Sequence, residues 1–265
     1  MPAWCIRAET SEGETVRLNF RSMLPAAFLL CSMQAHAGDP DMKLAALFDR
    51  PLATRTVPAM TDAEEGNELR CTYYRDFLIR EKGTDTPAPD AAVIIAVTKA
   101  AAQPPCKTAS GAEIKLATEN FSLVGRKGGY LMFQATDPNG AVPFMVIDAA
   151  TGKTIYTDGM VEDLMRSVTL ANGVLRLKYT RGMNGSCSLV SGGKTCWDKL
   201  VADGVVPAEL AQSPLPTQAC LVSYRREKAP ADDPSVVTFD VDMTLDLSGK
   251  AETISRGKVG CNPMP

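Results

Sequence analysis

The sequence predicts a mainly β protein: an antiparallel β-sandwich or an open, barrel-like sheet, with one or two short helices, stapled by disulfides. Three observations predict this class. Short apolar runs are separated by turn sequences, of which Asn172-Gly173 is the strongest, because both residues tolerate the positive φ of a tight hairpin. Residues 236–247 alternate between apolar and polar side chains, as a half-buried strand does. Six cysteines follow residue 37, and the repeated hairpins favour antiparallel over parallel pairing.

The first part of the chain ends in a pattern typical of a secretory signal peptide. Arg17 and Arg21 form its cationic start, and residues 23–33 form an apolar stretch that is too short to span a bilayer. Ala35-His36-Ala37 has the small-x-small pattern of a cleavage site. We therefore expect a mature chain that begins at Gly38 and is periplasmic or secreted.

Residues 1–15 carry three glutamates, which are unfavourable in front of a signal peptide. We interpret them as an extension that a misplaced start codon adds, so residues 1–37 are extension plus signal. Residues 38–265 then form a single secreted β-rich domain. A lipid anchor at Cys31 is the alternative, but a lipoprotein signal has a small residue at the position of Leu30.

The composition of residues 38–265 excludes several classes of function. His36 is the only histidine, so the mature chain has none, and the Ser-His-Asp and Cys-His mechanisms are excluded. Basic and acidic residues are interspersed and the chain has a formal net charge of −3, so no clustered cationic surface for nucleic acid is expected. No segment after residue 37 is long and apolar enough to cross a membrane. We expect no cofactor.

The six remaining cysteines predict three disulfides, because an exported chain meets an oxidising compartment. A zinc site is disfavoured, since no two cysteines have Cys-x-x-Cys spacing and no histidine is available. The sequence leaves the pairing open, and we favour neighbours. The expected pairs are Cys71–Cys106, Cys187–Cys196 and Cys220–Cys261, the middle pair being favoured by the two glycines in its short loop.

The first half of the mature chain predicts a short helix followed by strands. Asp39 would cap the helix, Pro40 would occupy its first position, and Pro51 would end it. The strands are predicted by alternating or continuous apolar runs. The expected elements are a helix over 39–48, a loop over 52–67, a strand over 69–80, a loop over 81–90, a strand over 91–97 and a helical turn over 100–105.

The stretch from 121 to 179 has the clearest hairpin pattern. Turn sequences rich in Gly, Asp and Asn interrupt its apolar runs at short intervals. The expected loops lie at 125–129, 137–140, 148–153 and 172–173, and the expected strands at 130–135, 144–147, 154–157 and 175–179.

The last third predicts one helix and three strands. Trp197 and Leu200 would share the apolar side of the helix. In the long strand, Val237 to Leu247 in steps of two share one face, and the alternate residues share the other. The expected elements are a helix over 195–201, a loop over 207–218, and strands over 220–225, 236–247 and 251–261.

Four short motifs suggest chemistry, and each is better explained by structure. Ser191-x-x-Lys194 matches the serine-nucleophile pattern of penicillin-recognising enzymes but lacks their companion elements. The two Gly-Lys-Thr sequences, at 152–154 and 193–195, lack the preceding glycine of a phosphate loop. The alternate aspartates of the long strand lie too far apart along it to surround one calcium ion, so we expect a solvated acidic stripe. Asp137 and Asn139 are expected to stabilise their own turn.

Aromatic side chains could mark a partner surface if exposed, but most are expected in the core or on a sheet face. We expect Trp197 to pack on the disulfide of its neighbour Cys196. The candidates are Tyr73, Tyr74, Tyr130, Tyr179, Trp197 and Tyr224.

Several sequence segments together resemble a group of uncharacterised secreted bacterial proteins. They include a Cys-Trp pair at 196–197 and an Asp-x-x-Thr-Gly-Lys hairpin at 148–153, with residues 70–74, 144–158 and 177–181 beside them. The resemblance covers most of the mature chain. It implies no activity and assigns a role to no residue.

These observations predict an exported, non-catalytic binding module of the cell envelope, whose partner is another envelope protein or a polymer. One alternative is a histidine-free glycan hydrolase that uses two carboxylates about 5–10 Å apart. Another is an inhibitor of a cell-wall lytic enzyme. We expect no catalytic residues and no metal-binding residues.

Overall fold

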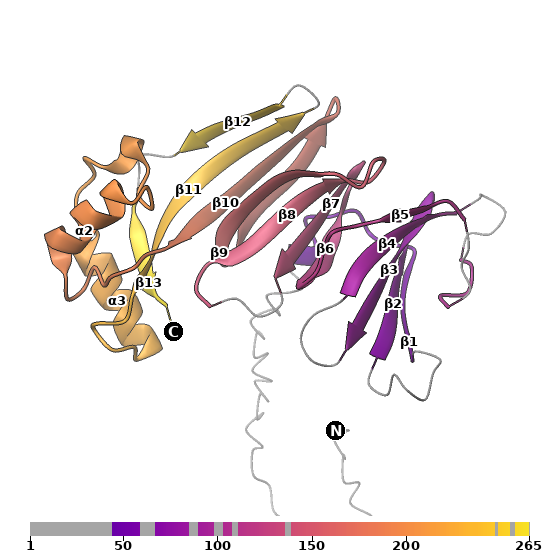
Figure 1. Cartoon of the computed structure of the whole chain (residues 1–265). Coiled ribbons are helices and arrows are strands. Elements are labelled where there is room, and N and C mark those ends of the chain that lie inside the picture. Colours follow the sequence, from indigo (N-terminus) through magenta and orange to yellow (C-terminus); the bar gives the residue numbers. More distant parts are fainter. Residues whose placement is uncertain are drawn as a thin grey trace, which may run out of the picture. The chain divides into compact units, whose positions relative to one another are not determined.

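The computed structural model describes residues 44–58, 67–84, 90–97, 103–107, 111–135, 139–246, 249–254 and 258–264. The chain separates into two units, Met1–Ala37 and Gly38–Pro265, and all described residues belong to the second. The described part is mainly β, with two antiparallel sheets and two α-helices (Figure 1). It also contains three disulfides. The predicted fold class is therefore confirmed. The expected signal peptide lies outside the described residues.

The smaller sheet has five strands in sequence order, each paired with the next along the chain. Its strands are β1 (Ala53–Pro58), β2 (Asn67–Tyr73), β3 (Phe77–Thr84), β4 (Asp90–Ala96) and β5 (Glu113–Lys115).

The larger sheet has eight strands, and β6 to β12 again follow one another in sequence order, while β13 pairs with β11. Its strands are β6 (Phe121–Lys127), β7 (Tyr130–Ala135), β8 (Val142–Asp148), β9 (Thr154–Ala171), β10 (Val174–Asn184), β11 (Ser235–Asp246), β12 (Gly249–Ile254) and β13 (Gly260–Pro263). The β9–β10 hairpin turns at Asn172-Gly173, where both residues have positive φ as expected.

Strand β9 bends where it passes from one neighbour to the other. The first part of β9 pairs with β8 and the second part pairs with β10. The register between β9 and β10 shifts between Tyr179 and Arg181, on either side of Thr180. Gly159 and Gly182 allow neighbouring segments of backbone to lie close together at this point. A Cβ atom on Gly159 would lie 2.8 Å from the Gly182 oxygen, and a Cβ atom on Gly182 would lie 2.9 Å from the Ala141 Cβ.

Hydrophobic clusters cover both faces of the middle of the larger sheet. Leu131, Phe133 and Ile147 share a cluster with Ile79 and Ile94 of the smaller sheet, so these two sheets pack on each other. The opposite face carries the largest cluster, in which strand residues meet the two helices. That cluster includes Phe144, Tyr179, Val237, Phe239, Trp197, Leu200 and Tyr224.

The helices are held to the strands by disulfides. Cys187–Cys196 joins the chain after β10 to α2 (Gly193–Ala202), and Cys220–Cys261 joins α3 (Thr217–Glu227) to β13. Cys71–Cys106 staples the smaller sheet. All three pairings are those expected from the sequence.

Two expected elements are wrong. Residues 53–58, expected in a loop, form β1, an edge strand whose side chains are mostly exposed and therefore show no apolar alternation. Residues 220–225, expected as a strand, lie within α3. Cys220, Ser223 and Tyr224 are buried at helical spacing, while Val222 is 63% exposed.

Several expected boundaries also shift. The strand expected over 69–80 is the β2–β3 hairpin, β3 continues into the expected loop at 81–90, and residues 251–261 contain two strands, β12 and β13. The expected loop at 207–218 contains a short 3₁₀ helix, Ala208–Leu210, and the start of α3. Residues 103–107 contain no helix. Half of the helix expected over 39–48 lies outside the described residues, and in the described half residues 44–45 are helical while 46–48 form a turn and a bend.

Candidate functional site

The motifs that suggested catalysis are not assembled into sites. Lys194 donates to both carboxylate oxygens of Asp198, one turn along α2, at 2.7 Å, so it does not serve Ser191. Asp240 and Asp242 pair with Arg166 and Lys178, so the expected acidic stripe is partly neutralised. Asp137 lies outside the described residues. The described residues hold no group of three His, Cys, Asp or Glu side chains placed to bind a metal.

Most of the candidate aromatic residues are in the core. Tyr73, Tyr74, Tyr179, Trp197 and Tyr224 are buried, and Tyr130 is half-buried. Trp197 belongs to the same hydrophobic cluster as Cys196, and its indole donates to the Ala211 carbonyl at 3.2 Å. The five buried aromatic residues therefore provide no exposed surface for a partner, and Tyr130 is only partly accessible.

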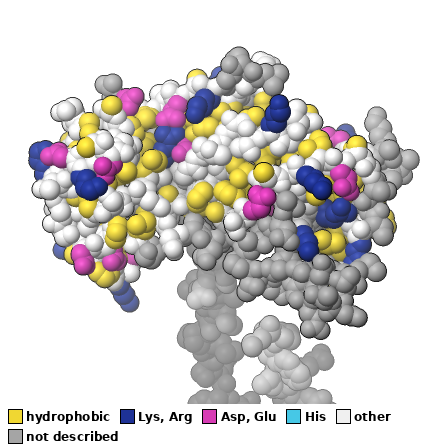
Figure 2. Space-filling model, viewed as in Figure 1, with side chains coloured by type: hydrophobic (Ala, Val, Ile, Leu, Met, Phe, Trp, Pro, Cys, Tyr) yellow, Lys and Arg dark blue, Asp and Glu magenta, His cyan; other side chains and the backbone are white. Residues whose placement is uncertain are grey.

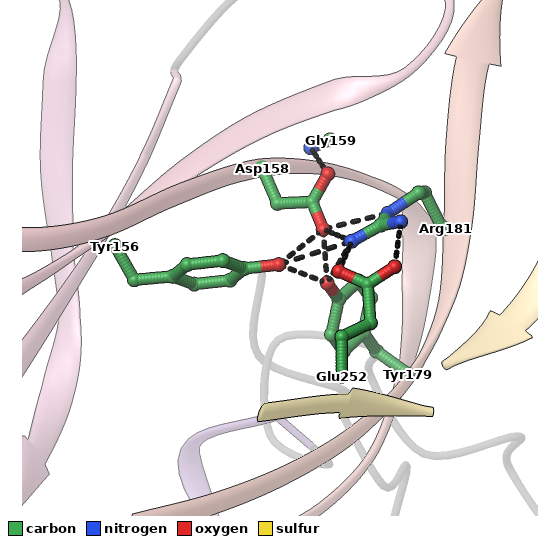
Figure 3. A network of polar contacts seen from close by, with 6 residues as sticks. All are labelled: Tyr156, Asp158, Gly159, Tyr179, Arg181 and Glu252. Atoms are coloured by element: carbon green, nitrogen blue, oxygen red, sulfur yellow. Dashed lines mark hydrogen bonds and ion pairs between the residues drawn. The ribbon is translucent and has the colours of Figure 1, made fainter. Parts of the chain in front are cut away.

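A polar network that was not expected from the sequence lies at the bend of β9 (Figure 3). It joins Tyr156 and Asp158 of β9, Tyr179 and Arg181 of β10, and Glu252 of β12. In β9 and in β10, the tyrosine and the charged residue of the network are two positions apart, so they lie on the same face of the strand. The sequences Tyr-Thr-Asp at 156–158 and Tyr-Thr-Arg at 179–181 carry this signal.

Asp158 Oδ2 is the acceptor at the centre of the network. It accepts from Nε and Nη2 of Arg181 at 2.7 and 2.5 Å, from the Tyr156 hydroxyl at 2.6 Å, and from the Tyr179 hydroxyl. The other oxygen, Oδ1, accepts the Gly159 N–H at 2.8 Å. Arg181 also donates to both carboxylate oxygens of Glu252, at 2.6 and 2.8 Å. The Asp158 and Arg181 side chains are 10% and 11% exposed.

Burial and charge fix the protonation states in this network. Burial, followed by the interactions with Asp158, raises the pKa of the Tyr156 and Tyr179 hydroxyls, so both stay protonated and act as donors. Burial alone lowers the pKa of Arg181, but its hydrogen bonds to Glu252 and Asp158 outweigh burial and raise it. The guanidinium therefore stays charged.

The network is suited to hold strands together and poorly suited to acid–base chemistry. Both carboxylates are engaged by Arg181, and the two phenols already donate to Asp158. A general acid or base needs a group that can exchange a proton with substrate. The arrangement instead ties β9, β10 and β12 together where β9 bends.

The opposite face of the same strands carries a surface groove. Side chains alternate across a strand, so Thr180 and Asp240 face away from Tyr179 and Arg181. Arg166 donates to both oxygens of Asp240, at 2.8 and 2.6 Å, and to the Thr180 hydroxyl at 2.9 Å. Two hollows of about 370 and 550 Å³ adjoin this trio and share Arg166 and Asp240. Because the two hollows share these residues, they are together called the groove.

The groove has a polar floor and an apolar wall. Lys178, Asp242 and Thr253 extend the floor at one end. The wall at the other end is formed by Leu164, from the irregular part of β9, by the segment before α3 and its first turn, and by Val259 before β13. Leu164 is 41% exposed, whereas the bordering aromatic residues Tyr179 and Phe239 are buried. The wall residues are Leu164, Pro214, Leu215, Pro216, Ala219 and Val259.

On the face in view in Figure 2, Lys and Arg side chains lie next to Asp and Glu side chains. Among the described helices, none is long and apolar enough to cross a membrane. The sequence matches no protein-family model and no curated protein.

Proposed function

We propose that the protein is an exported binding module, and that its groove over β9, β10 and β11 takes an extended segment of another protein of the cell envelope. The single observation that carries this proposal is the groove itself. A floor of alternating charges beside an apolar wall fits a peptide chain, which offers backbone polar groups and apolar side chains together.

The shape and lining of the groove favour a protein partner over a polysaccharide. Sugar rings are commonly bound on exposed aromatic faces, and the aromatic residues that border this groove are buried. The mixed charges of the floor also favour a neutral or zwitterionic segment over nucleic acid, which needs a clustered cationic surface.

The catalytic alternative has less support. Asp158 and Glu252 lie close together because Arg181 binds both of them. A carboxylate hydrolase needs one free acid and one free base or nucleophile. Inhibition of a cell-wall lytic enzyme remains compatible with the proposal, since the partner would then be that enzyme.

Export supports the choice of an envelope partner. It rests on the signal pattern at residues 17–37 and on the three disulfides, which form in oxidising compartments. N-terminal sequencing of the exported protein is expected to read Gly-Asp-Pro-Asp. A chain that keeps residues 1–37 would contradict export.

The experiment that tests binding compares two matched surface substitutions. Leu164→Asp places a charge in the apolar wall, and Val222→Asp makes the same kind of change on α3, outside the groove. Each variant is used to capture cross-linked partners from an envelope extract. We expect a partner recovered by the unmodified protein and by Val222→Asp, with recovery about tenfold or more lower for Leu164→Asp.

Two outcomes would contradict the proposal. One is equal recovery of the same partner by Leu164→Asp. The other is capture of a polysaccharide, with no protein partner, by the unmodified protein.

A further inference from the structure

A pocket of about 340 Å³ lies at the edge of the larger sheet, apart from the groove. We propose that it binds small molecules that carry a carboxylate, an amide and an apolar side chain, the class of N-acylated amino acids. The pocket is lined by Leu44, Ala45, Arg70, Ser122, Leu123, Val124 and Gln134. Its volume lies within the range of about 300–1,000 Å³ that is usual for such sites. The inference does not depend on the proposed function.

The pocket exists because β6 is an edge strand that is only partly covered. Near one end of β6, the Asp49 N–H donates to the Arg126 carbonyl at 2.7 Å, and Lys127 donates to the Leu47 carbonyl at 3.0 Å. Farther along β6, the Leu123 N–H donates to the buried Glu81 carboxylate of β3 at 2.8 Å. The space beside residues 122–124 is left as the pocket.

Two polar side chains of the pocket have unmet bonding capacity. Gln134 Oε1 is buried without a hydrogen-bond partner, which is uncommon in a folded protein and asks for an explanation. The last torsion of a glutamine side chain is soft, so its amide can turn toward the pocket at little cost. Arg70 is exposed, and within the described part of the chain its guanidinium interacts electrostatically with Glu81 across the β2–β3 pair but makes no hydrogen bond.

The proposed ligand class meets each of these groups. A carboxylate matches the planar guanidinium of Arg70. A secondary amide offers both a donor and an acceptor, so it satisfies the Gln134 amide in either orientation, and Ser122 adds a hydroxyl. Leu44, Leu123 and Val124 provide the apolar contact for a side chain such as isobutyl.

The charge of Glu81 affects how strongly Arg70 attracts an anionic ligand. Glu81 lies directly across the β2–β3 pair from Arg70, and its Oε2 is buried without a partner. When Glu81 is ionised, its negative charge repels an anionic ligand and offsets part of the attraction between that ligand and Arg70. Removing this charge should therefore strengthen binding of the ligand, an effect that loss of a merely structural residue would not produce.

The test uses N-acetyl-leucine as the probe and the complete purified protein. Binding is measured by calorimetry and by ligand-observed NMR. We expect saturable binding that is weakened about tenfold or more by Arg70→Gln, weakened by Gln134→Leu, and strengthened by Glu81→Gln. Arg176→Gln is the matched control, because Arg176 is an exposed arginine of β10 that does not line the pocket, and it should leave binding unchanged.

Three results would overturn the proposal. The first is no saturable binding of the probe to the unmodified protein at millimolar concentration. The second is equal weakening by Arg70→Gln and Arg176→Gln, which would indicate a non-specific charge effect. The third is unchanged binding in Arg70→Gln and Gln134→Leu when circular dichroism shows both variants folded.

Discussion

At the scale of single residues, charge is placed in two different ways. Arg181 is nearly buried and fully engaged by Asp158 and Glu252, whereas Arg166 makes a similar two-oxygen contact with Asp240 at the surface. Two charges removed from water depend on each other far more than two charges that remain solvated. The two arginines therefore provide a matched pair for measurement.

Arg181→Met is expected to lower the free energy of unfolding by about 3–5 kcal/mol, because it leaves the Asp158 carboxylate buried without its cation. Arg166→Met breaks the exposed pair and is expected to cost at most about 1 kcal/mol. Urea denaturation of both variants measures the difference. Equal losses would show that the buried network does not stabilise the bend of β9.

Glu81 gives the fold a pH dependence whose sign can be stated. Burial raises the pKa of Glu81 above its usual value of 4.5, although the Leu123 N–H and Arg70 act in the opposite direction. The folded state therefore binds this proton more tightly than the unfolded state. The contribution of Glu81 to stability falls as pH rises from its unfolded pKa through its folded pKa, and it stays low above that window.

Glu81→Gln removes this titration while keeping an oxygen that can accept the Leu123 N–H. The free energy of unfolding of Glu81→Gln relative to the unmodified protein should therefore increase with pH across that window. Thermal melts at a series of pH values measure it, and a difference that is constant with pH would refute the assignment.

At the scale of elements, the disulfides attach helices that are short for independent stability. α2 and α3 have 10 and 11 residues, so their packing on the strands maintains them. Cys187–Cys196 closes a short loop next to α2, while Trp197 and Leu200 already bury one side of that helix. The bond is therefore an addition to an existing hydrophobic contact.

Replacing both Cys187 and Cys196 with serine is expected to lower stability by roughly 2–3 kcal/mol without abolishing the fold. The matched comparison replaces Cys71 and Cys106, which are 35 residues apart, and is expected to cost about 4 kcal/mol because the closed loop is longer. Denaturation curves measure both losses, and peptide mapping without reduction checks the pairings. A larger loss from the shorter loop would contradict the loop-entropy explanation.

At the scale of the whole molecule, the features that could be predicted from the sequence are those that depend on residues close together in the chain. Asn172-Gly173 and the glycine turns marked their hairpins because turn geometry depends on a few adjacent residues. β1 was missed because an exposed edge strand has no apolar face, and α3 was misread as a strand over 220–225, although its buried residues follow helical spacing. Pairing of neighbouring cysteines was also correctly expected.

The candidate sites could not be predicted in the same way. Arg181 and Glu252 are 71 residues apart and meet only because β12 folds back along β11. The groove depends on Leu164, which is exposed where the register of β9 shifts, and a register shift leaves no periodic signal. The pocket beside β6 depends on Arg70 reaching from the other sheet.

The order of the strands has a consequence for how the chain reaches this structure. Nearly every strand pairs with the next one along the chain, in both sheets. Most of these pairings therefore close a short stretch of backbone, which costs little entropy and favours rapid folding, but β10 pairs with β11 only after the long segment that contains α2 and α3. A chain that emerges gradually from its N-terminal end can add strands up to β10 one at a time to the pairs already formed, and the larger sheet is then completed after both helices have emerged.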